Sequence, residues 1–149
     1  MELREAISGK RVYVDTNILI YLFEGFAEYL PLMQQLAQCV DSKEIRLLTG
    51  EITLAELMVM PFKNNDTNAI NLYTKALNDR KFITLIPTTQ KVYIKTAFLR
   101  ATLSGMKTPD SIHVASAVEG KADVFITNDQ GIKIPKGLEK LMLRDFCRI

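Results

Sequence analysis

The sequence contains no tryptophan, only one histidine and only two cysteines among its 149 residues. Zinc sites in proteins are built from several histidine and cysteine ligands. Cys39 and Cys147 lie far apart in the chain and form no Cys-x-x-Cys pair. The sequence therefore excludes a zinc ribbon, a multi-histidine metal site and a cysteine redox pair. We interpret both cysteines as buried or incidental thiols of a reducing compartment.

Long apolar runs are missing as well. A membrane-spanning helix needs 18 or more consecutive apolar residues, and no window of the sequence supplies them. Residues 1–10 also lack the apolar core of a secretory signal. We therefore expect a cytoplasmic protein with no membrane partner. The 48% hydrophobic and 24% charged content is ordinary for a globular protein, so we expect a single domain over residues 1–149.

The sequence has little net charge, +2 in total, but the two halves differ in sign. Residues 1–80 carry 8 basic and 11 acidic side chains, whereas residues 81–149 carry 11 basic and 6 acidic ones. A basic half is compatible with a polyanionic partner, although a solvated basic surface is the simpler explanation.

Short runs with strand character alternate with longer stretches of helical periodicity. The strand-like runs are residues 11–14, 45–48, 82–86, 124–126 and 141–143. The helical stretches are residues 17–23, 29–42, 53–61, 66–79, 90–104 and 109–119. This alternation predicts an α/β fold with a parallel central sheet of about five strands, flanked by helices on both faces.

Four acidic residues fall at places that a parallel sheet uses for ligands. Asp15 and Asp129 follow strand-like runs, whereas we place Glu56 and Asp110 in the first turns of predicted helices. Ligands of open parallel sheets bind beyond the carboxyl ends of the strands. We therefore expect all four carboxylates to face the same edge of the sheet.

Each of these acids also has an ordinary structural explanation. Asp15 suits a helix N-cap, and Asp129 suits a turn. Glu56 could close a capping box with Thr53, and Asp110 could favour the dipole of its helix. The joint pattern is harder to explain by caps and turns, because crowded carboxylates raise one another's pKa unless a cation neutralises them. Mg²⁺ or Mn²⁺, which prefer oxygen ligands and can activate a water beside a phosphate, would do so.

Four segments in this order resemble the motifs of PIN-domain ribonucleases. They are Val14-Asp15-Thr16-Asn17, Leu54-Ala55-Glu56, Thr108-Pro109-Asp110-Ser111-Ile112-His113-Val114-Ala115-Ser116-Ala117 and Ile126-Thr127-Asn128-Asp129. The resemblance spans nearly the whole chain. It is strongest to the compact VapC-type toxins of bacterial and archaeal toxin–antitoxin pairs.

The resemblance implies a Mg²⁺- or Mn²⁺-dependent endoribonuclease with an RNA substrate. It also implies a cognate antitoxin protein as partner and a homodimer. Asn17 and Thr127 match the supporting polar positions of the family. The catalytic, metal-binding quartet of the family falls on Asp15, Glu56, Asp110 and Asp129.

Other functions remain open on the sequence alone. The chain could be a PIN-domain nuclease that processes RNA without being a toxin, or a non-catalytic module of this fold that binds RNA or protein. An aspartyl-phosphate phosphotransferase or a receiver-like domain is a third class, but the hydrolase form needs Asp-x-Asp after the first strand and position 17 is Asn. We interpret the one histidine, His113, as structural, because its mid-helix position offers it no ligand partner.

Overall fold

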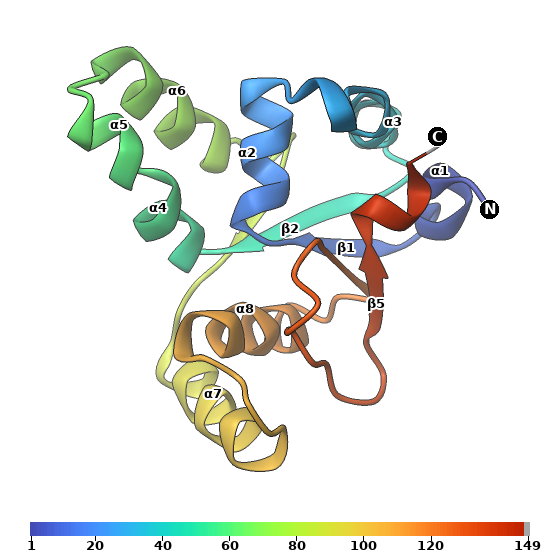
Figure 1. Cartoon of the computed structure of the whole chain (residues 1–149), viewed down its shortest axis with the longest axis vertical. Helices are drawn as coiled ribbons and strands as arrows, with labels where there is room; N and C mark the ends of the chain where they lie inside the picture. Colours follow the sequence, from blue (N-terminus) through green and yellow to red (C-terminus); the bar gives the residue numbers. More distant parts are fainter. Residues whose placement is uncertain (148–149) are drawn as a thin grey trace.

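The computed structural model of the chain describes residues 1–147 (Figure 1). At its centre is a parallel sheet with the strand order β3-β2-β1-β4-β5. Its strands are β1 (Arg11–Val14), β2 (Arg46–Gly50), β3 (Thr84–Ile86), β4 (Val124–Thr127) and β5 (Glu139–Met142). The predicted α/β fold with a five-stranded parallel sheet is confirmed.

Helices cover both faces of this sheet. Figure 1 shows α7 and α8 on one side of it and α2, α3 and α6 on the other. None of the helices in residues 1–147 has both the length and the apolar character needed to cross a membrane. The α-helices are α1 (Leu3–Ile7), α2 (Thr16–Glu24), α3 (Leu30–Asp41), α4 (Ile52–Leu57), α5 (Val59–Lys63), α6 (Thr67–Leu77), α7 (Gln90–Thr102) and α8 (Thr108–Glu119), with short 3₁₀ helices at Ala27–Tyr29 and Leu143–Phe146.

The alternation of side chains along β1 divides the core in two. Val12 and Val14 are fully buried in a cluster formed with residues of α1, α2, α3 and α6. Tyr13, between them, is fully buried in a second cluster with residues of α7 and α8. Successive side chains of a strand point to opposite faces, so every residue of this short strand after Arg11 is buried. The strand has no polar outer face, as a central parallel strand requires.

Most expected elements form with shifted ends, and one expected helix is divided. The stretch 53–61 was expected to be a single helix that ends at Pro61, and this is wrong. Two helices form instead, α4 and α5, and Pro61 lies within the first turn of α5. Proline is tolerated there because the first amides of a helix have no intrahelical acceptor. The helix α1 was not predicted.

The ends of α2 show why the chain turns where it does. Asp15 caps its start, where the side chain accepts a hydrogen bond from the amide of Ile18. Gly25 ends it in the left-handed conformation, with φ of 67°, which costs glycine little because it has no Cβ. The first candidate acid is thus placed by the junction between β1 and α2.

Candidate active site

The first acid lies buried where β1 passes into α2. Asp15 is 6% exposed. Its Oδ1 accepts a hydrogen bond from the Ile18 amide at 3.4 Å, and its Oδ2 accepts one from the Thr127 hydroxyl at 2.5 Å. Burial raises the pKa of Asp15 above its ordinary value, although the bond from Thr127 works in the opposite direction. The N-cap explanation is therefore correct but accounts for only one of the two carboxylate oxygens.

Thr127 connects this carboxylate to the segment that carries the fourth acid. The residue ends β4 and is fully buried, and its hydroxyl oxygen accepts a hydrogen bond from the Asp129 amide at 3.0 Å. The carboxylate of Asp129 accepts a bond from the Gly131 amide at 2.8 Å, so the expected turn forms. Asp129 itself lies exposed. One hydroxyl thus fixes the carboxylate of Asp15 and the backbone of Asp129 together.

The second acid is bound differently from either of its sequence explanations. Helix α4 has Glu51 as its N-cap residue, so Glu56 lies in its last turn and not in its first. The capping box with Thr53 is wrong for the same reason, since Thr53 is inside the helix. Glu56 Oε1 instead lies 2.7 Å from the Thr16 hydroxyl and 2.5 Å from Nε2 of His113. Burial acts to raise the pKa of Glu56, but the hydrogen bonds from His113 and Thr16 hold it below its ordinary value.

The third acid stands in the first turn of α8, as expected. A helix N-terminus lowers the pKa of an acid, yet the pKa of Asp110 is raised, first by burial and then by the negative charge of Asp129. Glu56 adds to this repulsion, and Lys107 opposes it. Asp15 also interacts with Glu56 through charge, so each of the four acids lies close enough to at least one of the others to repel it.

Hydrogen bonds at this edge of the sheet form two groups, one that includes Asp15 and Asp129 and one that includes Glu56. Asp110 interacts with Asp129 and with Glu56 through charge. Asp15 and Asp129 are connected through Thr127, whereas Glu56 is bonded to the residue that follows Asp15 in the chain. The remaining predicted residue, Asn17, lies exposed in the first turn of α2. As the side chains stand, residues 1–147 contain no group of three His, Cys, Asp or Glu that could hold a metal ion.

The chemistry of the donor set nevertheless fits a hard divalent cation better than any other group. Burial, together with repulsion from neighbouring carboxylates, raises the pKa of Asp15 and of Asp110. A cation with a preference for oxygen ligands would relieve that repulsion. Zinc fits less well, because both ring nitrogens of the one histidine, His113, are occupied by other side chains.

The structure corrects the interpretation of His113 as a residue without a partner. His113 is 3% exposed, and its Nδ1 lies 2.7 Å from the hydroxyl of Tyr13. Its Nε2 contacts Glu56, one of the predicted site residues. Two signals in the sequence were available. His113 follows Asp110 by three residues, so both lie on one face of the helix, and Tyr13 occupies the strand position that faces away from Val12 and Val14.

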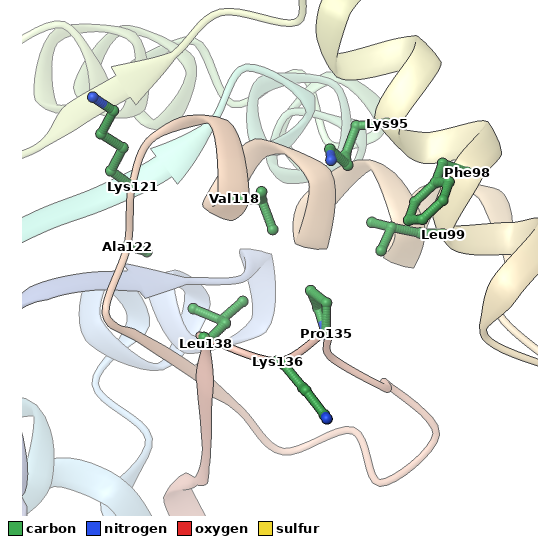
Figure 2. Close-up of a pocket in the computed structure, with 10 residues that line it drawn as sticks. Lys95, Phe98, Leu99, Val118, Lys121, Ala122, Pro135, Lys136 and Leu138 are labelled. Atoms are coloured by element: carbon green, nitrogen blue, oxygen red, sulfur yellow. The ribbon is translucent and has the colours of Figure 1, made fainter.

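A well-formed cavity of about 390 Å³ lies elsewhere, between α7, α8 and the segment that leads into β5 (Figure 2). Its apolar lining includes Leu99, Val118 and Leu138. Figure 2 shows the side chains of Lys121 and Lys136 extending away from this apolar lining. None of the four candidate acids is among its lining residues. The acid-bearing edge and this cavity are therefore separate parts of the molecule.

Comparisons with known proteins agree with the fold. A family model described as the PIN domain matches residues 12–137. No curated protein matches the sequence. A chain of a toxin-antitoxin complex from Klebsiella pneumoniae is 25% identical, with a TM-score of 0.62, over 85% of this chain and 94% of its own.

Two further solved structures share the fold at lower identity. A chain of VapBC2 from Rickettsia felis, bound to a DNA fragment from their promoter, is 19% identical over 87% of this chain and 97% of its own, with a TM-score of 0.60. A chain of DNA-bound VapBC from Salmonella typhimurium is 14% identical over 89% of this chain and 97% of its own, with a TM-score of 0.58.

Proposed function

The chain belongs to the PIN domain family, and from this premise we propose that it is a metal-dependent endoribonuclease that acts as the toxin of a type II toxin–antitoxin pair. The observation that carries the proposal is the meeting of the four acids at one edge of the sheet, where Thr127 joins Asp15 to the backbone of Asp129 and Thr16 binds Glu56. Asp110 interacts with Asp129 and Glu56 through charge. Carboxylates that repel one another in a folded protein point to a function, because the repulsion costs stability. In a nuclease that uses a divalent cation, the bound cation would neutralise this repulsion.

Asp15, Glu56 and Asp110 would hold Mg²⁺ or Mn²⁺, with Asp129 holding the ion or one of its waters. When bound, such an ion supplies positive charge at the phosphate and lowers the pKa of a water nucleophile. The residues of the protein would position the carboxylates and the substrate. Thr127 orients Asp15 through a 2.5 Å hydrogen bond, and Asn17 stands exposed beside it, free to contact the RNA backbone.

The RNA substrate would approach an edge that is not uniformly acidic. Lys107 is the N-cap residue of α8 and lies near enough to Asp110 to lower its pKa. The basic residues of the second half add positive charge to the surface. We expect RNA affinity to fall as salt rises, because phosphate contacts release counterions.

A cognate antitoxin is the proposed protein partner. Support comes from the similarity to a chain of a toxin-antitoxin complex at 25% identity over most of both chains. Helix α5 adds support, since Val59, Met60 and Phe62 are 46%, 57% and 63% exposed on one short helix. Exposed apolar side chains in such a group are typical of a protein interface. We also propose a homodimer, which light scattering of the purified chain would test.

Cleavage of a mixed RNA pool tests the proposed activity. The lanes contain the wild type with Mn²⁺ or Mg²⁺, the wild type with EDTA, and the Asp15→Asn variant, whose amide oxygen can still accept the bond from Thr127. We expect cleavage in the wild-type lanes with metal and in no other. A folded Asp15→Asn variant that still cleaves would refute the assignment. Binding of RNA by a wild type that binds no Mn²⁺ would favour the non-catalytic module.

A non-toxin PIN nuclease that processes RNA is the alternative that this assay does not separate. Both enzymes would cleave RNA with the same residues. Expression of the wild type and of Asp15→Asn in a bacterial host distinguishes them. A toxin arrests growth as wild type and not as the variant, whereas a processing nuclease arrests growth in neither case.

A further inference from the structure

A buried chain of hydrogen bonds leads from the end of β2 to the carboxylate of Glu56. The amide of Gly50 donates to the hydroxyl of Tyr13 at 2.9 Å. That hydroxyl lies 2.7 Å from Nδ1 of His113, and Nε2 of His113 lies 2.5 Å from Glu56 Oε1. Tyr13 is fully buried and His113 is 3% exposed. The chain therefore runs through the protein interior and emerges only at the half-exposed Glu56.

The direction of each hydrogen bond follows from whether each group can donate or accept. A backbone amide only donates, so the Tyr13 oxygen accepts from Gly50 and its own hydrogen remains available. The acceptor that the structure places beside that hydrogen is Nδ1 of His113. An ionised carboxylate only accepts, so Nε2 must carry the hydrogen that reaches Glu56. The neutral imidazole with its proton on Nε2 satisfies both bonds.

We propose that His113 is a positioning residue for the nuclease site, held by Gly50 and Tyr13 in the Nε2–H tautomer so that it fixes the carboxylate of Glu56. This inference rests on the proposed function, in which Glu56 is a site residue. His113 acts through Glu56 and touches neither the substrate nor the reacting atoms. Side chains that orient the ligands of a metal site are a common part of such sites.

The residues around this chain of hydrogen bonds restrict the positions of the Tyr13 and His113 rings. The rings of Tyr13 and His113 meet edge to face, with centroids 5.8 Å apart, and Tyr13 stacks on Phe125 at 5.1 Å. A Cβ atom at Gly50 would lie 2.8 Å from the Tyr13 hydroxyl, so the absence of a side chain there admits that hydroxyl. Both rings are thereby fixed in place before any ligand arrives.

Glu56 needs such support because of where it stands. It lies in the last turn of α4, a helix of six residues, and its side chain is 38% exposed. A free glutamate there would lose rotamer freedom each time it was ordered. His113 and Thr16 both bond to Oε1. Anchoring of that one oxygen leaves Oε2 without a hydrogen bond from residues 1–147.

The tautomer of His113 is the first test, and it needs no activity. Because the chain has a single histidine, a ¹⁵N-labelled sample gives one set of imidazole signals. At about pH 8.5, where imidazole is ordinarily neutral, we expect the pattern of a proton on Nε2. The Nε2 signal should shift in Glu56→Gln. A proton on Nδ1, or a ring protonated on both nitrogens at this pH, would overturn the proposal.

Three variants test the positioning role on the function. His113→Leu removes the donor, His113→Gln restores an N–H near the position of Nε2, and Tyr13→Phe removes the hydroxyl that sets the tautomer. We expect the Kd for Mn²⁺ to rise and kcat to fall by about 10–100-fold in His113→Leu, with KM for RNA unchanged. His113→Gln should recover most of this loss, and Tyr13→Phe should lie between the two.

Matched controls separate positioning from packing. Val114→Ala removes a buried side chain next to His113 on the same helix, and Tyr73→Phe makes the same chemical change at a buried tyrosine of the other core cluster. Both controls should keep the wild-type Kd for Mn²⁺ even if their melting temperatures fall. Equal losses in Val114→Ala and His113→Leu would reduce His113 to a packing residue and overturn the proposal.

The experiments give different results if the proposed nuclease function is wrong than if only the positioning role of His113 is wrong. A wild type that binds no Mn²⁺ and cleaves no RNA would remove the nuclease, and the tautomer measurement would still decide whether the chain of bonds exists. A wild type that is active while His113→Leu is equally active would leave the nuclease intact and remove the positioning role alone.

Discussion

Asp15 and Asp110 lie at the same edge of the sheet, but the surrounding protein binds the carboxylate of Asp15 with hydrogen bonds and does not bind that of Asp110. Asp15 is 6% exposed and accepts hydrogen bonds on both oxygens. Within residues 1–147 no hydrogen bond reaches the carboxylate of Asp110, and burial and repulsion from Asp129 and Glu56 outweigh the attraction of His113 and Lys107 and raise its pKa. One acid is therefore held by the scaffold, and the other is placed in the site at a cost to stability. A bound cation would supply the further positive charge needed to offset the repulsion at Asp110.

The largest effect is expected where the scaffold depends on the carboxylate. Asp15→Ala removes the acceptor of the fully buried Thr127 hydroxyl and of the Ile18 amide, whereas Asp15→Asn keeps one amide oxygen that can accept one of the two bonds. We expect Asp15→Ala to be less stable than Asp15→Asn by about 1–2 kcal/mol, the cost of one further buried donor without an acceptor. Urea unfolding of the two variants measures the difference. Equal midpoints would show that Asp15 is no part of the scaffold.

A smaller effect of opposite sign is expected at Asp110. Without metal, Asp110→Asn removes a charge that its neighbours repel, so the melting temperature should rise by about 1–3 °C, a modest gain because solvent screens a half-exposed carboxylate. Calorimetry in EDTA measures it. With Mn²⁺ the order should reverse, since only the wild type gains from binding. A fall in melting temperature in EDTA would mean that Asp110 supports the fold after all.

The pH dependence of stability should sharpen the same contrast. The pKa of Asp110 is raised in the folded protein, so the native state binds more protons than the unfolded state above about pH 4. Stability from this group is therefore greatest at low pH and falls as pH rises through its native pKa. The advantage of Asp110→Asn in EDTA should accordingly grow between about pH 4 and 7. An advantage that shrank over this range would contradict the sign of the shift.

The smallest effect concerns the cation beside this acid. In the Asp15→Asn background, in which we expect no cleavage, Lys107→Ala should weaken binding to all RNA sequences alike. It should also reduce the salt dependence of log Kd by about 0.7, the value of one phosphate contact on a single strand. Lys136→Ala is the matched control, because Lys136 lies at the cavity between α7 and α8 (Figure 2). Equal effects of both changes would place the RNA elsewhere.

Much of this architecture could be predicted from the sequence. The bounds of β1 were predicted to the residue, because a short apolar run, Val12 to Val14, follows Arg11 and is buried on both faces. The division of residues 53–61 was not predicted, since Pro61 signals the end of a helix and equally suits a first turn. Helix α1 was missed because its five residues give too short a pattern to show periodicity.

The candidate site was predicted in its residue types better than in its contacts. The strand pattern predicted that Asp15 and Asp129 share one edge of the sheet, but it did not predict that β1 and β4 are neighbours, which brings the two acids together. The bonds of Glu56 to Thr16 and His113 could not be predicted, because they join segments 40 and 57 residues apart. The capping box within one helix was the only local alternative, and a buried partner from another element displaced it.

The central claim is that a divalent cation completes a site of which the scaffold fixes only part. Titration of Mn²⁺ into the wild type and Asp110→Asn by isothermal calorimetry, at neutral pH and with no RNA present, tests it most directly. We predict binding to the wild type and a Kd at least about 10-fold higher for Asp110→Asn, since that change removes a charged oxygen ligand. Equal affinity of the two proteins, or no binding to either, would contradict the claim.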